Sequence, residues 1–158
     1  MKIYKYCLAI MTFFSLASCS SVDVNLPSYD HLISQQTEQD GTICLRQRNI
    51  QGYALLDDEV IRFDSRGNNS YYLATTVSRC NSLKANFALA LKGDFSEICG
   101  GKRDKVLTTS ESCAIKSIFE FKSKADAFAT FEKADKIRQN LRKELQEQAS
   151  AKKVETAA

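Results

Sequence analysis

The chain has 158 residues, of which 22 are Lys or Arg and 19 are Asp or Glu, so its net charge is +3. This length suits one domain and is short for two. The balanced charge argues against nucleic acid as a partner, because phosphate binding needs a concentrated basic surface. After the N-terminal region, no segment approaches the roughly 18 apolar residues that a transmembrane helix needs.

Residues 1–18 have the features of a signal peptide. Lys2 and Lys5 precede the uncharged run Tyr6–Leu16, which has the length of a signal-peptide h-region. The run ends in Leu16-Ala17-Ser18-Cys19, which resembles the lipobox of bacterial lipoproteins. The resemblance implies cleavage before Cys19, a diacylglyceryl group on its sulfur and acylation of the new amine. The alternative is an ordinary secretory signal in which Cys19 is incidental.

The lipoprotein resemblance also implies a location. In enterobacteria-like cells, Asp directly after the lipidated cysteine retains a lipoprotein at the inner membrane, so Ser20 implies transfer to the outer membrane, facing the periplasm. The inner membrane and the cell surface stay open as alternatives. Multiple acyl chains exceed the two signals that stable anchoring requires. The expected membrane contact is therefore the lipid on Cys19.

Residues 19–41 are mostly polar and contain Pro27, the only proline. We predict that they form a lipidated flexible tether that reaches about 70 Å when extended. The single histidine, His31, lies in this tether and is a poor metal ligand or general base. The folded domain is expected over residues 42–150, followed by a frayed tail over 151–158.

Short segments rich in aromatic and β-branched residues, separated by turn-forming residues, predict strands. In chain order they are residues 42–46, 53–56, 60–63, 71–77, 87–91, 105–108 and 114–121. In the last segment, the alternation places Ile115, Phe119 and Phe121 on one face.

The pattern becomes helical after residue 122. Ser123-Lys124-Ala125-Asp126 resembles a capping box, and apolar residues then recur every three or four positions from Phe128 to Leu145. We expect Phe128 and Phe131 to dock on the sheet, although residues 137–145 could instead bind a partner. The predicted fold is α+β: a small antiparallel sheet or half-open β-barrel of six or seven strands with one long C-terminal helix.

Four cysteines follow the tether, namely Cys44, Cys80, Cys99 and Cys113. An even number of cysteines in an exported domain predicts two disulfides. The absence of a Cys-x-x-Cys pair argues against a zinc or redox site. Three connectivities are open. We favour Cys44–Cys113, which would join the first strand to the last, with Cys80–Cys99 closing a local loop.

Other motifs do not support a chemical activity. Gly100-Gly101-Lys102 lacks the first glycine and the final Ser or Thr of a phosphate-binding loop. Residues Asp57-Asp58-Glu59 form a polar turn, and consecutive carboxylates on a strand point to alternate faces, so they are not expected to converge on a cation. No serine has a histidine to activate it, which excludes the usual hydrolase triad. With no other motif for a chemical activity, we predict no catalytic residue, metal or cofactor.

Three arginines, Arg46, Arg48 and Arg62, are candidates for binding a carboxylate or phosphate. Arg46 and Arg48 share one face of the first predicted strand, and Arg62 is expected nearby. Charges that protect an exposed sheet edge are the simpler interpretation.

The cysteines and their neighbours resemble a group of small proteobacterial envelope lipoproteins with a domain of unknown function. The resemblance covers about residues 42–121 and implies no activity. The motifs are Cys44-x-Arg46-x-x-x-Ile50-x-Gly52-Tyr53, Asp57-Asp58, Tyr72-Leu73, Arg79-Cys80-x-x-Leu83, Ile98-Cys99 and Cys113-x-Ile115.

We therefore expect an outer-membrane lipoprotein that acts as a non-enzymatic binding or accessory module with an envelope protein partner. The alternative is a small-ligand binder, with a half-barrel pocket lined by Tyr53, Tyr71 or Tyr72 and an arginine. An enzyme using Asp, Arg and Tyr alone ranks third. A deep pocket would favour a small ligand, and an exposed apolar patch would favour a protein partner.

Overall fold

The computed structural model describes residues 26–66, 70–85, 89–101 and 104–155. The predicted signal peptide, Cys19 and Phe87 lie outside these residues. The elements are, in chain order, α1 (Tyr29–Thr37), β1 (Cys44–Arg46), the 3₁₀ helix η1 (Gln47–Asn49), β2 (Ile50–Leu55), β3 (Val60–Ser65), β4 (Tyr71–Thr76), the 3₁₀ helix η2 (Asn81–Ala85), β5 (Ala90–Lys92), the 3₁₀ turn η3 (Asp94–Ser96), β6 (Glu97–Cys99), β7 (Lys105–Leu107), β8 (Ser112–Phe121) and α2 (Lys124–Glu155).

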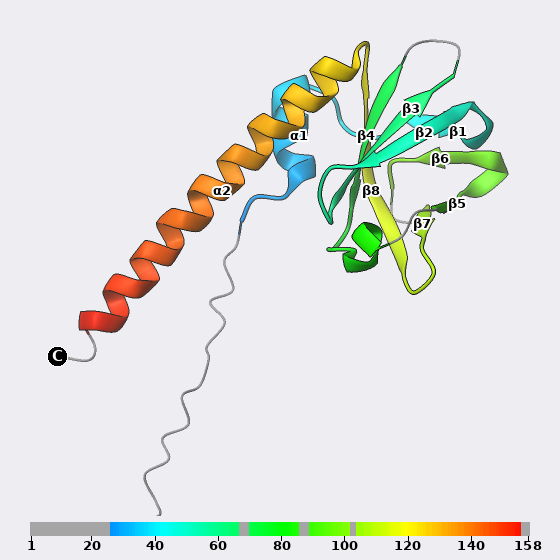
Figure 1. Ribbon diagram of the computed structural model, residues 1–158. Helices are drawn as coiled ribbons and strands as arrows, with labels where there is room; N and C mark the ends of the chain where they lie inside the picture. The colour runs from blue at the N-terminus through cyan, green and yellow to red at the C-terminus, as the bar shows by residue number, and fades with distance from the viewer. Residues whose placement is uncertain (1–25, 67–69, 86–88, 102–103, 156–158) are drawn as a thin grey trace, which may run out of the picture.

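Six of the described strands form one antiparallel sheet in the order β2-β3-β4-β8-β7-β5, and β1 pairs with β6 in a second sheet. The connection η1 leads from β1 into β2, and η3 leads from β5 into β6. The small sheet is thus joined by short connections to both edge strands of the large one, and both helices lie on one side (Figure 1). The predicted α+β half-barrel is confirmed. Strand β6 was not predicted, because Ile98 is the single residue that marks its buried face.

The large sheet has a hydrophobic core on each face. One core includes Ile61 and Phe63 and is closed by Ile98 of the small sheet. The other includes Leu73 and Phe119 and is covered by the two helices. Successive strand residues point to opposite faces, so β3, β4 and β8 supply both cores.

A bulge in β8 decides which residues reach which core. Thr75 pairs with Ser117 but Thr76 pairs with Ile115, so one residue of β8 is unpaired. Ile115 consequently joins the core inside the half-barrel, while Phe119 joins the core beneath the helices. The prediction that Ile115 and Phe119 share a face is wrong, because strict alternation ignores this extra residue.

The prediction that residues 19–41 form a flexible tether is wrong for residues 29–37, which form α1. Tyr29, Leu32 and Ile33 have the spacing of one helix face and are buried. Burial of each such side chain stabilises the fold by about 1.5–3 kcal/mol. Asp30 adds an ion pair with Lys116 of β8 at 2.9 Å. The folded domain therefore includes α1.

The start of α2 agrees with the sequence. The Ser123 hydroxyl accepts a hydrogen bond from the Asp126 backbone N–H at 3.0 Å, as an N-cap does. Ala127, Phe131 and Ala134 form its buried stripe, whereas Phe128 is 43% exposed, so the prediction that Phe128 docks on the sheet is wrong.

The 32 residues of α2 give a length of about 48 Å, and the helix extends well beyond the sheets (Figure 1). Neither α2 nor any other helix of the described residues combines the length and apolar character that a membrane span requires.

Two disulfides are present, as predicted, but their pairing differs from the favoured one. Cys44 and Cys99 face each other in the β1–β6 register and are bonded. Cys80, just before η2, is bonded to Cys113 of β8. The predicted pairs Cys44–Cys113 and Cys80–Cys99 are therefore wrong. Pairing depends on which strands become neighbours, and cysteine spacing does not show this.

Trypsin can test the pairing directly. It cleaves after Lys and Arg, and at least one such residue separates each of the four cysteines from the next, so each cysteine lies in a different peptide. A non-reducing digest should link the Cys44 peptide to the Cys99 peptide, as measured by mass spectrometry. A Cys44–Cys113 link would contradict the structure.

Replacing the two cysteines of either disulfide should lower the free energy of unfolding by roughly 4 kcal/mol, because the unfolded chain gains loop entropy. Replacing the Cys80–Cys113 pair should lower the free energy of unfolding by more than replacing the other pair, because both of its cysteines are buried in the core. Urea denaturation measures this difference.

Candidate functional site

The connection η3 presents an unusual side chain. Phe95 is 100% exposed, and its φ of 53° and ψ of 33° place it in the left-handed region. Ser96 follows with a φ of 64°. Each left-handed residue other than glycine costs roughly 1–2 kcal/mol. A large aromatic side chain that is held in solvent on a strained backbone contributes little to folding, which directs attention to binding.

Close packing around the turn holds this conformation. A side chain at Gly93 would collide with the backbone carbonyl oxygen of Glu97, so only glycine allows β5 and β6 to approach this closely. The Asp104 carboxylate is buried and accepts a hydrogen bond from the Cys99 N–H at 2.6 Å. With the Cys44–Cys99 disulfide, these contacts fix β6 beside η3.

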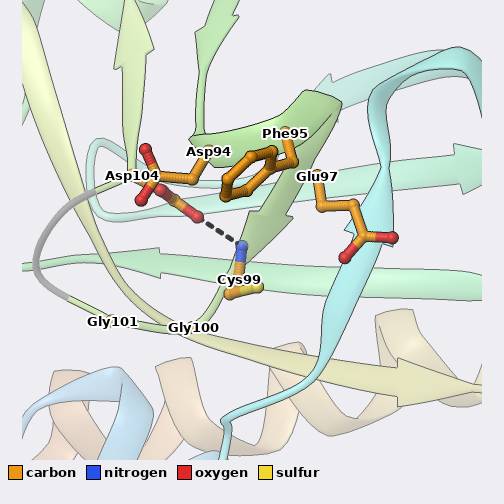
Figure 2. A pocket seen from close by; sticks show the side chains of 7 residues that line it. All are labelled: Asp94, Phe95, Glu97, Cys99, Gly100, Gly101 and Asp104. Atoms are coloured by element: carbon orange, nitrogen blue, oxygen red, sulfur yellow. Dashed lines mark hydrogen bonds between the residues drawn. The ribbon is translucent and has the colours of Figure 1, made fainter.

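Phe95 lines two hollows. Figure 2 shows the first, in which the ring lies between the carboxylates of Asp94 and Asp104 on one side and Glu97 on the other. This hollow has a volume of about 500 Å³ and is lined by Asp94, Phe95, Glu97, Cys99, Gly100, Gly101 and Asp104. The second has a volume of about 380 Å³ and is lined by Arg46, Arg48, Phe95, Ser96 and Glu97. We call the residues of the two hollows together the Phe95 surface.

Its charges are mixed and mostly in solvent. Arg46 pairs with Glu97 at 3.1 Å, but their side chains are 56% and 41% exposed, so the ion pair contributes little stability. Arg48 has no ion-pair partner among the described residues. The surface therefore combines one apolar anchor with a polar rim, as protein interfaces do.

Sequence reasoning did not select Phe95. The available signal for an exposed side chain was a single phenylalanine in a polar run, Gly93-Asp94-Phe95-Ser96-Glu97. An apolar residue in a turn has no strand or helix face to join.

The predicted arginine site is not assembled. Arg62 is buried and is held by Asp64, with 2.7 Å between its Nε and a carboxylate oxygen, so it is not available beside Arg46 and Arg48. Arg46 and Arg48 do line one hollow of the Phe95 surface.

The tyrosines of the predicted ligand pocket do not all share one face of the sheet. Tyr53 and Tyr72 pack against the core inside the half-barrel, while Tyr71 packs against the core beneath the helices. None of the three lines the Phe95 surface.

Two further sequence candidates have structural explanations. His31 lies exposed on α1. A side chain at Gly100 would collide with the backbone carbonyl of Gly41, so this glycine permits close packing. Lys102 lies outside the described residues. Among those residues, Cys80, Glu111 and Cys113 cluster as potential metal ligands, but the two sulfurs are joined in a disulfide.

Two of the three carboxylates of the β2–β3 turn, those of Asp57 and Asp58, do contact each other, contrary to the sequence-based expectation. Burial, followed by the hydrogen bond that protonated Asp57 donates to the Asp58 carboxylate, raises the pKa of Asp57 from 3.8 to about 6. Glu59 forms ion pairs with Arg79 at 3.3 Å and with Arg138 of α2 at 2.6 Å. The turn thus fastens α2 to the sheet through the ion pair between Glu59 and Arg138.

Replacing Asp57 with Asn should stabilise the protein in a pH-dependent manner. The folded state binds the Asp57 proton more tightly than the unfolded state, so wild-type stability falls as the pH rises from about 4 to 6, and the loss is complete above pH 6. Asn keeps a hydrogen-bond donor without the charge. Since Asp57 is only half buried, we expect a gain of about 1 kcal/mol at pH 7.5 and almost none at pH 4.

Urea denaturation at the two pH values measures this difference. Asp94→Asn, at an exposed position in η3 and outside the surroundings of Asp57, is the matched control and should show no such pH-dependent gain. Equal gains for Asp57→Asn at both pH values would contradict the proton linkage.

Comparison with known proteins gives a family but no activity. No curated protein and no solved structure matches the chain. The model of a family described as "Family of unknown function (DUF6491)" matches residues 2–152. This range extends beyond residues 42–121 at both ends and includes α1, the Phe95 surface and most of α2. The chain therefore belongs to this family of unknown function.

Proposed function

We propose that the protein is an outer-membrane lipoprotein that faces the periplasm and acts as a non-enzymatic module, binding an envelope protein through the Phe95 surface. The observation that carries the binding role is the fully exposed Phe95 on a strained backbone. Aromatic side chains are enriched among the residues that dominate binding energy at protein interfaces. A protein partner would bury this ring and offset the cost of holding it in solvent.

Two features support the location. The Leu16-Ala17-Ser18-Cys19 sequence resembles a lipobox, and two disulfides suit an oxidising compartment. Because α1 begins at Tyr29, ten residues after Cys19, the chain between them spans at most about 35 Å. The domain would then stay close to the membrane. The β5–β6 end, which carries Phe95, lies across the sheet assembly from α1 (Figure 1).

A second candidate function is small-ligand binding at the same place. The 500 Å³ hollow beside Phe95 falls within the size range of small-molecule sites. Its carboxylates, from Asp94, Glu97 and Asp104, would favour a cationic ligand with an aromatic or apolar group. Ligand screening with the purified domain distinguishes this candidate from a protein partner.

Replacing Cys19 with Ser should abolish membrane anchoring. We expect wild-type protein to partition into detergent and to carry the added mass of the acyl chains, while the Cys19→Ser protein stays in the aqueous phase. Cys7→Ser is the matched control and should behave like wild type, because Cys7 lies in the segment that cleavage removes. Ser20→Asp should move the protein to the inner-membrane fraction of a density gradient. A mature wild-type chain with unmodified Cys19 would refute the lipid anchor.

Replacing Phe95 with Ala should remove binding without loss of fold. The tagged protein, purified from gently solubilised envelopes, should retain a stoichiometric partner, and the Phe95→Ala variant should bind that purified partner at least tenfold more weakly. Phe128→Ala is the matched control, because Phe128 is also an exposed phenylalanine but lies on α2, outside the Phe95 surface. It should bind the partner like wild type.

Two outcomes would count against the binding role. Full affinity in Phe95→Ala would show that the ring is not the anchor. The absence of a stoichiometric partner on wild type, both lipidated and in a soluble version with Cys19 replaced, would reject the protein-binding module.

A further inference from the structure

A second cleft lies apart from the Phe95 surface, where α1, the β2–β3 turn, the region around η2 and α2 meet. It has a volume of about 260 Å³, comparable to that of eight or nine water molecules. Every residue that lines it is polar or charged, or carries a hydroxyl in the case of Tyr29. The donors and acceptors that the protein itself leaves unused determine what such a cleft can bind.

The acceptors of the cleft are occupied by the protein itself. The Asp135 carboxylate accepts a hydrogen bond from the Tyr29 hydroxyl at 2.8 Å and another from Gln139 at 2.7 Å. Asp58 lies 3.7 Å from the Lys84 ammonium and also contacts the carboxyl group of Asp57. Little acceptor capacity is left for a ligand.

The donors, in contrast, are not all used. Arg138 is only 7% exposed, and one guanidinium nitrogen donates to Glu59, but its Nε is buried and has no hydrogen-bond partner among the described residues. Arg142 follows one helical turn later on the same face of α2, is exposed, and has no ion-pair partner in the described part of the chain. A buried donor without an acceptor is uncommon and points to a missing group.

One cation of the cleft is left for an anion. Of the four cationic side chains that line it, Arg79 and Arg138 pair with Glu59 and Lys84 pairs with Asp58, so Arg142 is the one without an ion-pair partner among the described residues. The guanidinium of Arg138 is also fixed, because it stacks 4.0 Å above the Tyr29 ring. A guanidinium held in place binds the paired oxygens of a phosphate with little loss of conformational freedom.

We propose that this cleft binds a phosphate group, with Arg142 as the principal ligand and Arg138 as the buried donor behind it. The phosphate can come from a free phosphate compound or from a lipid headgroup. The lipid source rests on the proposed anchor, since Tyr29 at the cleft lies only ten residues after Cys19. Binding of free phosphate does not depend on the anchor.

The first test uses the soluble protein with Cys19 replaced and inorganic phosphate as the probe. Isothermal titration should show binding to wild type and at least tenfold weaker binding to Arg142→Gln, a variant that should fold because Arg142 is exposed. Arg66→Gln is the matched control, since it removes an exposed arginine that lines neither this cleft nor the Phe95 surface, and it should bind phosphate like wild type. Arg138→Lys, which keeps a cation for Glu59 but lacks the Nε donor, should also weaken binding.

The second test distinguishes the two sources. Flotation with phosphatidylcholine vesicles that contain phosphatidic acid should carry the protein upward if the source is a headgroup, and Arg142→Gln should abolish this. Phosphate binding without vesicle binding supports the same cleft with a soluble ligand. The proposal is overturned if wild type does not bind phosphate, or if Arg142→Gln binds phosphate as wild type does. Neither result bears on lipidation or on Phe95.

Discussion

The fold depends on β8, the strand that must serve two cores at once. It pairs with β4 on one side and β7 on the other, so it links the two halves of the large sheet. Its bulge directs Ile115 and Ile118 into the half-barrel and Phe119 toward the helices. Without that extra residue, one end of the strand would turn its apolar side chains to the wrong face. The inner core and the helix-covered core therefore form together.

The helix-covered face depends on both apolar and charged contacts. Tyr29 of α1 stacks on Phe131 of α2 with ring centroids 5.7 Å apart. The Arg138 guanidinium also stacks on the Tyr29 ring. Arg138 in turn reaches Glu59 at the end of the β2–β3 turn. A buried charge of this kind is costly unless it is paired, so α1, the turn and α2 must be in place together. This mutual dependence explains why the segment before β1 is part of the domain.

Much of the fold could be predicted from the sequence, and the errors share a physical origin. The strands with clear alternation and the capped helix at Ser123 were found, because their signals are local. Helix α1 was missed because only three apolar residues in a Gln-rich stretch mark it, and they are buried by a helix nearly a hundred residues later. The disulfide pairing, the β8 bulge and the ion pairs that Glu59 forms with Arg79 and Arg138 also depend on distant neighbours.

The Phe95 surface depends on a bond that forms only after the chain is made. Strands β1 and β6 have three residues each and pair only with each other in the described sheets, so their backbone hydrogen bonds alone are a weak support. The Cys44–Cys99 bond lies directly across this pair, three residues from Ser96. Reduced chains would lack the support that keeps η3 in its left-handed shape. Oxidation of Cys44 and Cys99 is therefore the step that completes the Phe95 surface, and a chain with reduced cysteines would display this ring on a less ordered turn.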